Sequence, residues 1–309
     1  MHNVAQIAAR VESFVRTNKR PLIVILGPTA SGKTTLSIEL SKKLNGEIVS
    51  ADSRQVYRGM DIGTDKIKDT WKVPHHVIDV VNPDEPFTLV QYKEMAEGAI
   101  DDILARGNVP FLVGGTMLYI DAVVKNFQIP SSKVNSQWSM VSRDLREQLE
   151  QQSNEKLLAQ LQKLDPECAR GVDPKNKRRL VRALEYCLQT GGKFSRARNE
   201  GPRKYTSFMI GLDVPRAELY SCIDARIDKQ VRAGLVEETR TLAEKYGYDI
   251  PPMSALGYRQ VGRYLQGECS LEEAVQRLKF DTHAYARRQL VWWRKNKDIV
   301  WITIGLRKS

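Results

Sequence analysis

Hydrophobic positions along the first 130 residues alternate between short runs and helical stripes. Apolar runs rich in branched side chains predict buried strands at residues 22–26, 48–51 and 109–113. Between the first two runs, Leu36, Leu40 and Leu44 repeat at helical spacing and stop near Asn45-Gly46. Strands that alternate with helices predict an α/β fold with a mostly parallel sheet.

The pattern changes near Pro130. Residues 131–200 carry leucines at helical intervals and no convincing strand, with a break at Asp165-Pro166 and a further helix from about Asn176 to Gly191-Gly192. Apolar runs at 205–214 and 300–304 predict strands that return to the sheet, separated by a largely helical stretch. We therefore expect a phosphate-loop α/β core (1–130 and 201–309) flanked by helices, with an all-helical domain inserted at 131–200.

The N-terminal residues are amphipathic rather than uniformly apolar. Apolar side chains from Val4 to Val15 recur at helical spacing, with Arg10 and Glu12 between them. This pattern does not fit a secretory signal, and Glu12 weakens the alternative of a transit peptide. We expect a short helix packed on the core.

Composition narrows the class of protein. Hydrophobic residues make up 41% and charged residues 28%, which is typical of a globular protein. No apolar run approaches the ~20 residues of a membrane span. The four cysteines include no C-x-x-C pair, which argues against a disulfide framework or a cysteine zinc site. We expect a cytoplasmic protein without a membrane partner, and a monomer because the sequence shows no interface signal.

Positive charge is concentrated in two segments. The formal net charge is +11, and residues 131–204 and 277–309 carry +7 each. Clustered lysine and arginine suit a polyanionic partner such as nucleic acid. An ordinary charged surface that keeps the protein soluble is the other interpretation.

A phosphate-binding motif follows the first predicted strand and opens a helix. It reads G-x-x-x-x-G-K-T and consists of Gly27, Pro28, Thr29, Ala30, Ser31, Gly32, Lys33 and Thr34. Its backbone N–H groups and the helix N-terminus favour phosphate oxygens, Lys33 adds a mobile charge, and Thr34 can bind Mg²⁺. We therefore expect Mg²⁺ as a cofactor, held in part by Thr34.

The third predicted strand does not end in the acid expected of a nucleotide hydrolase. Such an enzyme needs an acid at the end of a core strand for Mg²⁺ and a group that positions water. The third strand instead runs into Gly114-Gly115-Thr116, and Asp52 is the one acid directly after a core strand. The loop therefore suits a phosphate that acts as a leaving group.

The carboxyl ends of parallel strands share one edge of the sheet, so Asp52 and the phosphate loop should line one cleft. Asp52 is either a general base or the cap of a turn. Gly114 and Gly115 allow a close approach of the backbone to a ligand, and Thr116 could bond a phosphate oxygen as well as cap the next helix. His75-His76 lacks an acidic partner for a metal and is interpreted as a loop or as a lining of the pocket.

The helix expected after Asn176 has two unlike faces. Leu180, Val181, Leu184, Cys187 and Leu188 share an apolar face, and Arg178, Arg179 and Arg182 lie almost opposite. Arginines with no carboxylate between them favour nucleic acid over a merely solvated face.

These features recur together in a known family. The marks are the motifs at residues 27–34, 52–57, 60–64, 114–119, 176–184, 255–260 and 285–289. From about Pro21 to its C-terminus the chain resembles the tRNA dimethylallyltransferases, also called tRNA isopentenyltransferases, of the bacterial type.

The resemblance implies transfer of a dimethylallyl group from dimethylallyl diphosphate to N6 of adenosine 37, beside the tRNA anticodon, with release of diphosphate. It implies that the phosphate loop binds the diphosphate, that Asp52 takes the proton from the adenine amine, and that Lys33 and Thr116 assist the reaction. Residues matching tRNA-contacting stretches are Asp52, Ser53, Arg54, Gln55, Arg178, Arg179, Arg182, Gly257, Tyr258, Arg259 and Gln260. The inserted domain would then hold the anticodon stem-loop.

The chain departs from the family pattern at three places. Arg178 stands where the family usually has glutamine. The family segment R-I-x-x-R-V appears as 226–231 with Gln230 in place of its second arginine, and the stretch up to Gly234-Leu235 is about four residues short. Either Arg226 or Arg232 could therefore support the diphosphate.

Three other functions remain open. An adenylate isopentenyltransferase would act on a free nucleotide, a phosphate-loop kinase would act on a small metabolite, and an RNA-binding protein would have no catalysis. The arginine face argues against the first alternative, the motifs at 52–57 and 257–260 against the second, and intact Lys33, Thr34 and Asp52 against the third.

Overall fold

The computed structural model describes residues 4–67, 73–129, 144–196 and 199–303. They form two compact units. The core unit comprises the chain up to Val124 and from Arg203 onward, and the insertion unit comprises Lys125–Pro202. The insertion therefore begins and ends a few residues outside the predicted 131–200.

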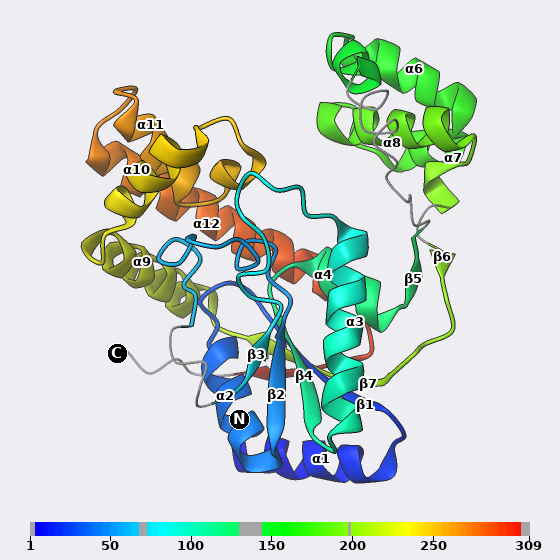
Figure 1. The fold of residues 1–309 in the computed structure, drawn as a ribbon, viewed down its shortest axis with the longest axis vertical. Coiled ribbons are helices and arrows are strands. Elements are labelled where there is room, and N and C mark those ends of the chain that lie inside the picture. Colours follow the sequence, from blue (N-terminus) through cyan, green and yellow to red (C-terminus); the bar gives the residue numbers. More distant parts are fainter. Residues whose placement is uncertain (1–3, 68–72, 130–143, 197–198, 304–309) are drawn as a thin grey trace. The chain divides into compact units, whose positions relative to one another are not determined.

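The core unit is built on a six-stranded parallel sheet of order β3-β2-β4-β1-β7-β8 (Figure 1). Its strands are β1 (Pro21–Leu26), β2 (Gly46–Ser50), β3 (His75–His76), β4 (Val109–Gly114), β7 (Thr206–Asp213) and β8 (Ile299–Thr303). Five of the six match predicted strands within two residues. Ile304, the predicted end of the last strand, lies outside the described residues. The two-residue strand β3 was not predicted, because its histidines gave no apolar run.

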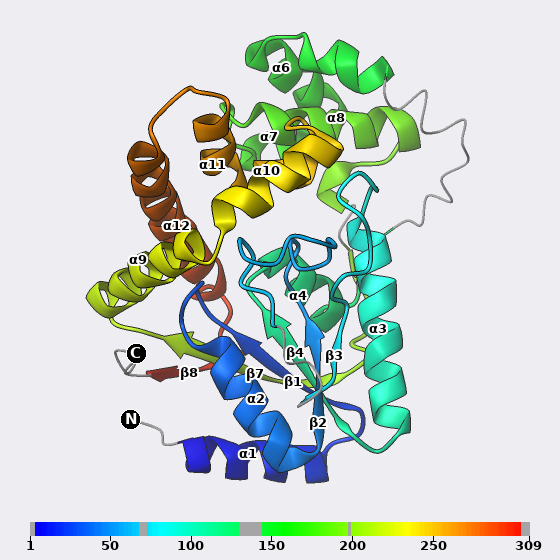
Figure 2. The same cartoon turned by 60° about the vertical axis from the view of Figure 1, so that its left-hand side comes forward.

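Helices cover both faces of the sheet (Figures 1 and 2), and alternate side chains of β1 belong to different apolar clusters. Ile23 and Ile25 pack in one apolar cluster with α1 (Val4–Thr17) and α2 (Lys33–Leu44). Leu22, Val24 and Leu26 belong to the opposite cluster, which includes α3 (Leu89–Ala105) and α4 (Met117–Val124). A strand buried on both faces needs this continuous apolar sequence.

A helical layer follows β7 and returns the chain to β8. It consists of α9 (Arg216–Arg232), α10 (Leu235–Tyr246), the 3₁₀ turn η2 (Pro251–Ser254), α11 (Tyr258–Leu265) and α12 (Leu271–Trp293). The long helix α12 packs on α9, α11 and α4. Tyr258 and Trp293 are buried in the same apolar cluster as Leu22 and Val24, so this layer is part of the core unit.

The insertion unit has an apolar core of its own. Residues 144–150 are helical, followed by α6 (Asn154–Leu164), α7 (Pro166–Gly171), α8 (Lys177–Thr190) and the 3₁₀ turn η1 (Phe194–Arg196). The prediction of no strand here was wrong at one place. β6 (Asn199–Glu200) pairs antiparallel with β5 (Phe127–Gln128), which precedes the unit's helices. Two-residue polar strands carry no apolar alternation, so the sequence could not reveal them.

Within the described ranges, no helix combines the length and the apolar character that crossing a bilayer requires.

Candidate active site at the carboxyl edge of the sheet

A cavity of about 380 Å³ opens where β1, β2 and β4 end. It brings together, from the predicted site, Thr29, Lys33, Thr34, Asp52, Ser53, Arg54, Gln55, Arg226, Gly257 and Arg259. All of these belong to the core unit. The expectation that Asp52 and the phosphate loop share one cleft is confirmed, because parallel strands bring their carboxyl ends to one edge.

The phosphate loop turns sharply into α2. Gly32 has φ 84°, a left-handed conformation that suits glycine, and precedes the first helical residue. Lys33 Nζ donates to the carbonyl of Pro28 at 2.7 Å. Gly27, Ala30, Ser31 and Gly32 shape the loop but do not line the cavity. Thr29, Lys33 and Thr34 are therefore the loop side chains that face it.

The cavity is a poor place for an isolated cation. The pKa of Lys33 is lowered to about 7, chiefly by burial and also by the nearby Arg226, while Asp52 opposes the shift. An anion bound beside Lys33 would restore its charge. The site is therefore arranged for a negatively charged ligand.

Asp52 caps a turn, which is one of the two roles considered for it, and also faces the cavity. Its Oδ1 accepts a hydrogen bond from the N–H of Arg54 at 2.8 Å, so it caps the turn after β2. It also lines the cavity, where its remaining acceptor capacity is available to a ligand. A turn cap and a general base are compatible in one carboxylate.

Thr116 links two loops. Its hydroxyl accepts a hydrogen bond from the N–H of Ser53 at 2.9 Å, in place of the predicted cap on α4. Thr116 does not line the cavity, whereas Gly114 and Gly115 do. Neighbouring protein atoms occupy the space that a side chain would need at these glycines. A Cβ on Gly114 would lie 2.1 Å from the carbonyl oxygen of Ala51. The prediction that they admit a ligand therefore missed their main packing role.

Of the two candidate arginines, Arg226 reaches the cavity. Its guanidinium donates to Thr29 Oγ1 at 2.6 Å and lies 3.5 Å from Asp65 Oδ2. Its Nε is buried with no partner among the described residues. Arg232 is exposed at the end of α9 and does not line the cavity. Arg226 is therefore placed to hold an anion.

The segment around α11 is only partly accessible. Gly257 and Arg259 line the cavity, but Tyr258 is fully buried and Gln260 is 3% exposed. Gln260 bonds the N–H of Gly257 and Asp281. Tyr258 and Gln260, which the motif assigned to RNA contact, are therefore buried, and Gly257 and Arg259 are the residues of this segment that line the cavity.

Gln289 is a site residue to which the sequence assigned no role. From α12, its Oε1 accepts from the N–H of Thr29 at 2.9 Å, and its Nε2 donates to the carbonyl of Gly115 at 2.8 Å. It thus ties the phosphate loop to the turn after β4. Its place in the motif at 285–289 was the one available signal.

The two histidines have different surroundings. His75 lines the cavity, as one interpretation expected, and His76 bonds Glu47 at 2.7 Å. They form β3 rather than a loop. The described residues contain no cluster of three or more His, Cys, Asp or Glu that could hold a metal.

The arginine face of α8 belongs to the insertion unit. Arg178 and Arg179 are exposed and have no ion-pair partner among the described residues. Arg182 is exposed but lies 3.4 Å from Glu185, a nearly buried carboxylate that the sequence argument overlooked. Leu188, assigned to the apolar face, is 48% exposed because it lies at the edge of the stripe.

Fold and cavity together define a phosphate-loop α/β protein whose site is arranged for an anionic ligand. The sequence model of the IPP transferase family matches residues 55–296. The chain is 47% identical to a tRNA dimethylallyltransferase of Roseiflexus sp. (strain RS-1), covering 91% of this chain and 92% of that protein. It is 44% identical to one from Thermomicrobium roseum, covering 93% and 88%.

Solved structures similar to this chain are named as enzymes of the same kind as these sequence relatives. A tRNA isopentenylpyrophosphate transferase from Bacillus halodurans is 39% identical with a TM-score of 0.68, over 92% of this chain and 90% of that one. A eukaryotic dimethylallyltransferase, studied acting on tRNA, is 28% identical with a TM-score of 0.76, over 92% and 74%. The chain belongs to the IPP transferase family.

Proposed function

We propose that this protein is a tRNA dimethylallyltransferase. It transfers the dimethylallyl group from dimethylallyl diphosphate to N6 of adenosine 37 and releases diphosphate. The observation that carries the proposal is the single cavity that contains both the phosphate loop and Asp52. The names of the relatives and the charge of the chain support it.

The diphosphate is the leaving group. Lys33, Thr29 and Arg226 face the cavity, and the buried Nε of Arg226 needs an acceptor. As the bond between the allylic carbon and oxygen breaks, negative charge grows on the diphosphate. Fixed cations and N–H donors stabilise that charge more than the ground state.

Asp52 receives the proton. The adenine N6 is a weak nucleophile because its lone pair is delocalised into the ring. As N6 bonds to the allylic carbon, it loses one proton to the Asp52 carboxylate, and diphosphate leaves with the electrons of the broken bond. The hydroxyl oxygen of Thr116 accepts a hydrogen bond from the N–H of Ser53 and so holds the loop that carries Asp52. The hydrogen of the same hydroxyl is still able to donate a second hydrogen bond.

Mg²⁺ remains part of the proposal. Thr34 lines the cavity, and its hydroxyl together with diphosphate oxygens would suit an ion that is usually bound by few protein groups and by substrate phosphates. When bound, the ion would neutralise charge on the diphosphate. Arg178 and Arg179 of α8, which have no ion-pair partner among the described residues, and the cavity-lining Arg259 would contact the RNA.

Labelled dimethylallyl diphosphate tests the proposal. The purified protein is offered unmodified tRNA in one reaction and AMP in another. Label in tRNA, and none in a tRNA whose adenosine 37 is replaced by guanosine, supports the proposal. Label in AMP alone would instead establish a free-nucleotide transferase, and no label in either would contradict prenyl transfer.

A further inference from the structure

One wall of the cavity is a loop with little secondary structure of its own. Residues 60–66 follow the Asp52 loop and contribute Gly63, Thr64 and Asp65 to the lining. Asp65 lies 3.5 Å from the guanidinium of Arg226, which bonds Thr29 of the phosphate loop. The position of this wall therefore affects a residue placed to hold the diphosphate.

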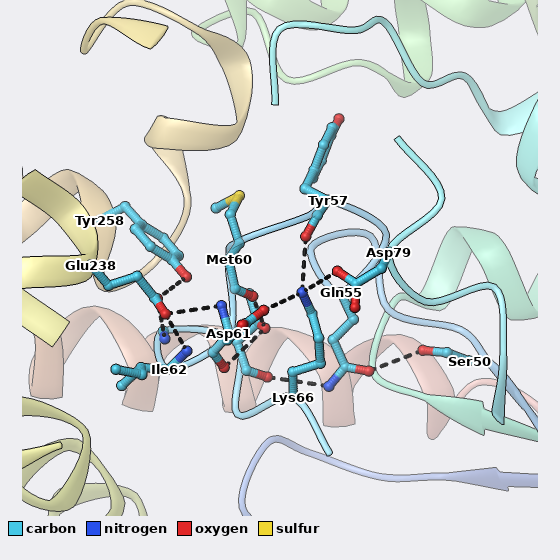
Figure 3. A network of polar contacts seen from close by, with 12 residues as sticks. Ser50, Gln55, Tyr57, Met60, Asp61, Ile62, Lys66, Asp79, Glu238 and Tyr258 are labelled. Carbon is cyan, nitrogen blue, oxygen red and sulfur yellow. Dashed lines mark hydrogen bonds and ion pairs between the residues drawn. The ribbon is translucent and has the colours of Figure 1, made fainter. Parts of the chain in front are cut away.

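A single carboxylate fastens this loop from outside the cavity (Figure 3). Glu238, in the first turn of α10, accepts hydrogen bonds from three consecutive backbone N–H groups. The bonds come from Asp61 at 3.1 Å, Ile62 at 2.7 Å and Gly63 at 3.0 Å. Glu238 does not itself line the cavity.

The same carboxylate also holds a second segment that lines the cavity. The hydroxyl of Tyr258 donates to Glu238 Oε1 at 2.7 Å. Tyr258 is fully buried, and its two neighbours, Gly257 and Arg259, line the cavity. Figure 3 shows Tyr258 and the loop converging on Glu238. The clamp, as we call Glu238 with Tyr258, therefore connects two lining segments almost two hundred residues apart in sequence.

Packing leaves the clamp little freedom. A Cβ added to Gly63 would lie 2.6 Å from the ring of Tyr258, closer than carbon atoms approach. The glycine of the 60–64 motif is thus needed for contact with Tyr258. Hydrogen bonds and steric fit fix the same two segments independently.

Other polar contacts hold the loop on its remaining sides. Gln230, which replaces the family's second arginine, donates to the carbonyl of Ile62 at 2.8 Å. Lys66 bonds Asp61 and Asp79 at 2.6 Å each, as Figure 3 shows. Gln55 donates to the carbonyl of Thr64 at 3.2 Å. Glu238 is the member that joins this network to Tyr258.

We propose that Glu238 is a positioning residue for the transfer reaction. Without contacting substrate, it sets the 60–66 loop so that Asp65 and Thr29 hold Arg226, and it sets Gly257 and Arg259 through Tyr258. The inference rests on the proposed function, because it concerns the site that would bind dimethylallyl diphosphate. A displaced binding group costs catalysis even when the fold survives.

Glu238→Gln is the decisive variant. The amide keeps the shape but directs an NH₂ donor at groups that already donate, so at least one backbone bond is lost. We expect kcat/KM for dimethylallyl diphosphate to fall about tenfold or more, mainly through KM. Tyr258→Phe removes one hydrogen bond and keeps the ring, so a smaller loss in the same direction is expected.

Glu237→Gln is the matched control. Its carboxylate is one residue away on the same helix, 73% exposed, and pairs with Arg240. We expect kinetics like those of the wild type. If Glu238 acts through Tyr258, the double variant Glu238→Gln with Tyr258→Phe loses less than the two single losses combined.

A purely structural role predicts a different result. Glu238→Gln would then lower the melting temperature while the folded enzyme kept kcat and KM within about twofold of wild type, and this outcome would overturn the inference.

Calorimetric titration with dimethylallyl diphosphate separates the positioning role of Glu238 from the proposed transfer function. If the wild type binds the ligand but transfers nothing to tRNA, the proposed function fails, and weaker binding by Glu238→Gln still supports the clamp.

Discussion

The cavity and the arginine face of α8 both present cations, but they hold them differently. Arg226 is bonded to Thr29 and close to Asp65, and Lys33 is buried against a backbone carbonyl. Arg178 and Arg179 are exposed and have no ion-pair partner in the described part of the chain.

We attribute this difference in how the cations are held to the different functions proposed for the two regions. Stabilising charge in a transition state needs donors fixed before the reaction, because reorganisation at that moment raises the barrier. Binding an RNA backbone is an electrostatic effect that tolerates mobile side chains and depends on salt. Changes in the cavity should therefore alter the rate of transfer, and changes on α8 should alter tRNA affinity.

The largest expected effect concerns Asp52. Asp52→Asn keeps an oxygen that can accept from the N–H of Arg54 but cannot take a proton from N6. We expect kcat to fall by about 10²–10⁴ while tRNA affinity changes little. Single-turnover transfer and a filter-binding assay measure the two quantities. A parallel loss of tRNA binding would make Asp52 a structural residue.

The second largest expected effect is a loss of tRNA affinity when the arginines of α8 are replaced. Replacing Arg178 and Arg179 with alanine should weaken tRNA binding and lower the slope of log K against log salt by about 1 for each lost phosphate contact. Binding of dimethylallyl diphosphate should be unchanged. Arg182→Ala is a poor control, since it removes a partner of the buried Glu185. An unchanged slope would exclude this face from the RNA interface.

The smallest expected effect is proton uptake at Lys33. Because its pKa is lowered to about 7, Lys33 is mostly neutral at about pH 8, and a bound diphosphate should restore its charge. Binding should then take up as much as one proton, measured by calorimetry in two buffers of different ionisation enthalpy. Lys33→Met, measured with the same ligand, should lack this component; equal uptake in both proteins would contradict the assignment.

The stability of the ligand-free protein should also depend on pH because of Lys33. Unfolded Lys33 keeps its ordinary pKa of 10.5, so the unfolded chain binds more protons between about pH 7 and 10.5. The contribution of Lys33 to stability therefore rises with pH through this window. Lys33→Met should flatten that part of the denaturation profile.

Local features were predicted well from sequence. Asn176 caps the start of α8 and Gly191 ends it in a left-handed conformation, as their residue types indicate. The order of strands and loops also placed Asp52 near the phosphate loop. Leu188 was misplaced because periodicity identifies a helix face, but neighbouring helices decide how wide its buried part is.

The sequence by itself determined the alternation of strands and helices, the phosphate loop and the identity of the charged residues. These depend on neighbours a few residues apart, where propensity and spacing act directly. Only the tertiary structure decided that Gln289 holds Thr29, that Arg226 rather than Arg232 reaches the cavity, and that Glu238 holds Gly63 and Tyr258. Such partners are far apart along the chain, and hydrogen bonds between them exist only after the core has packed.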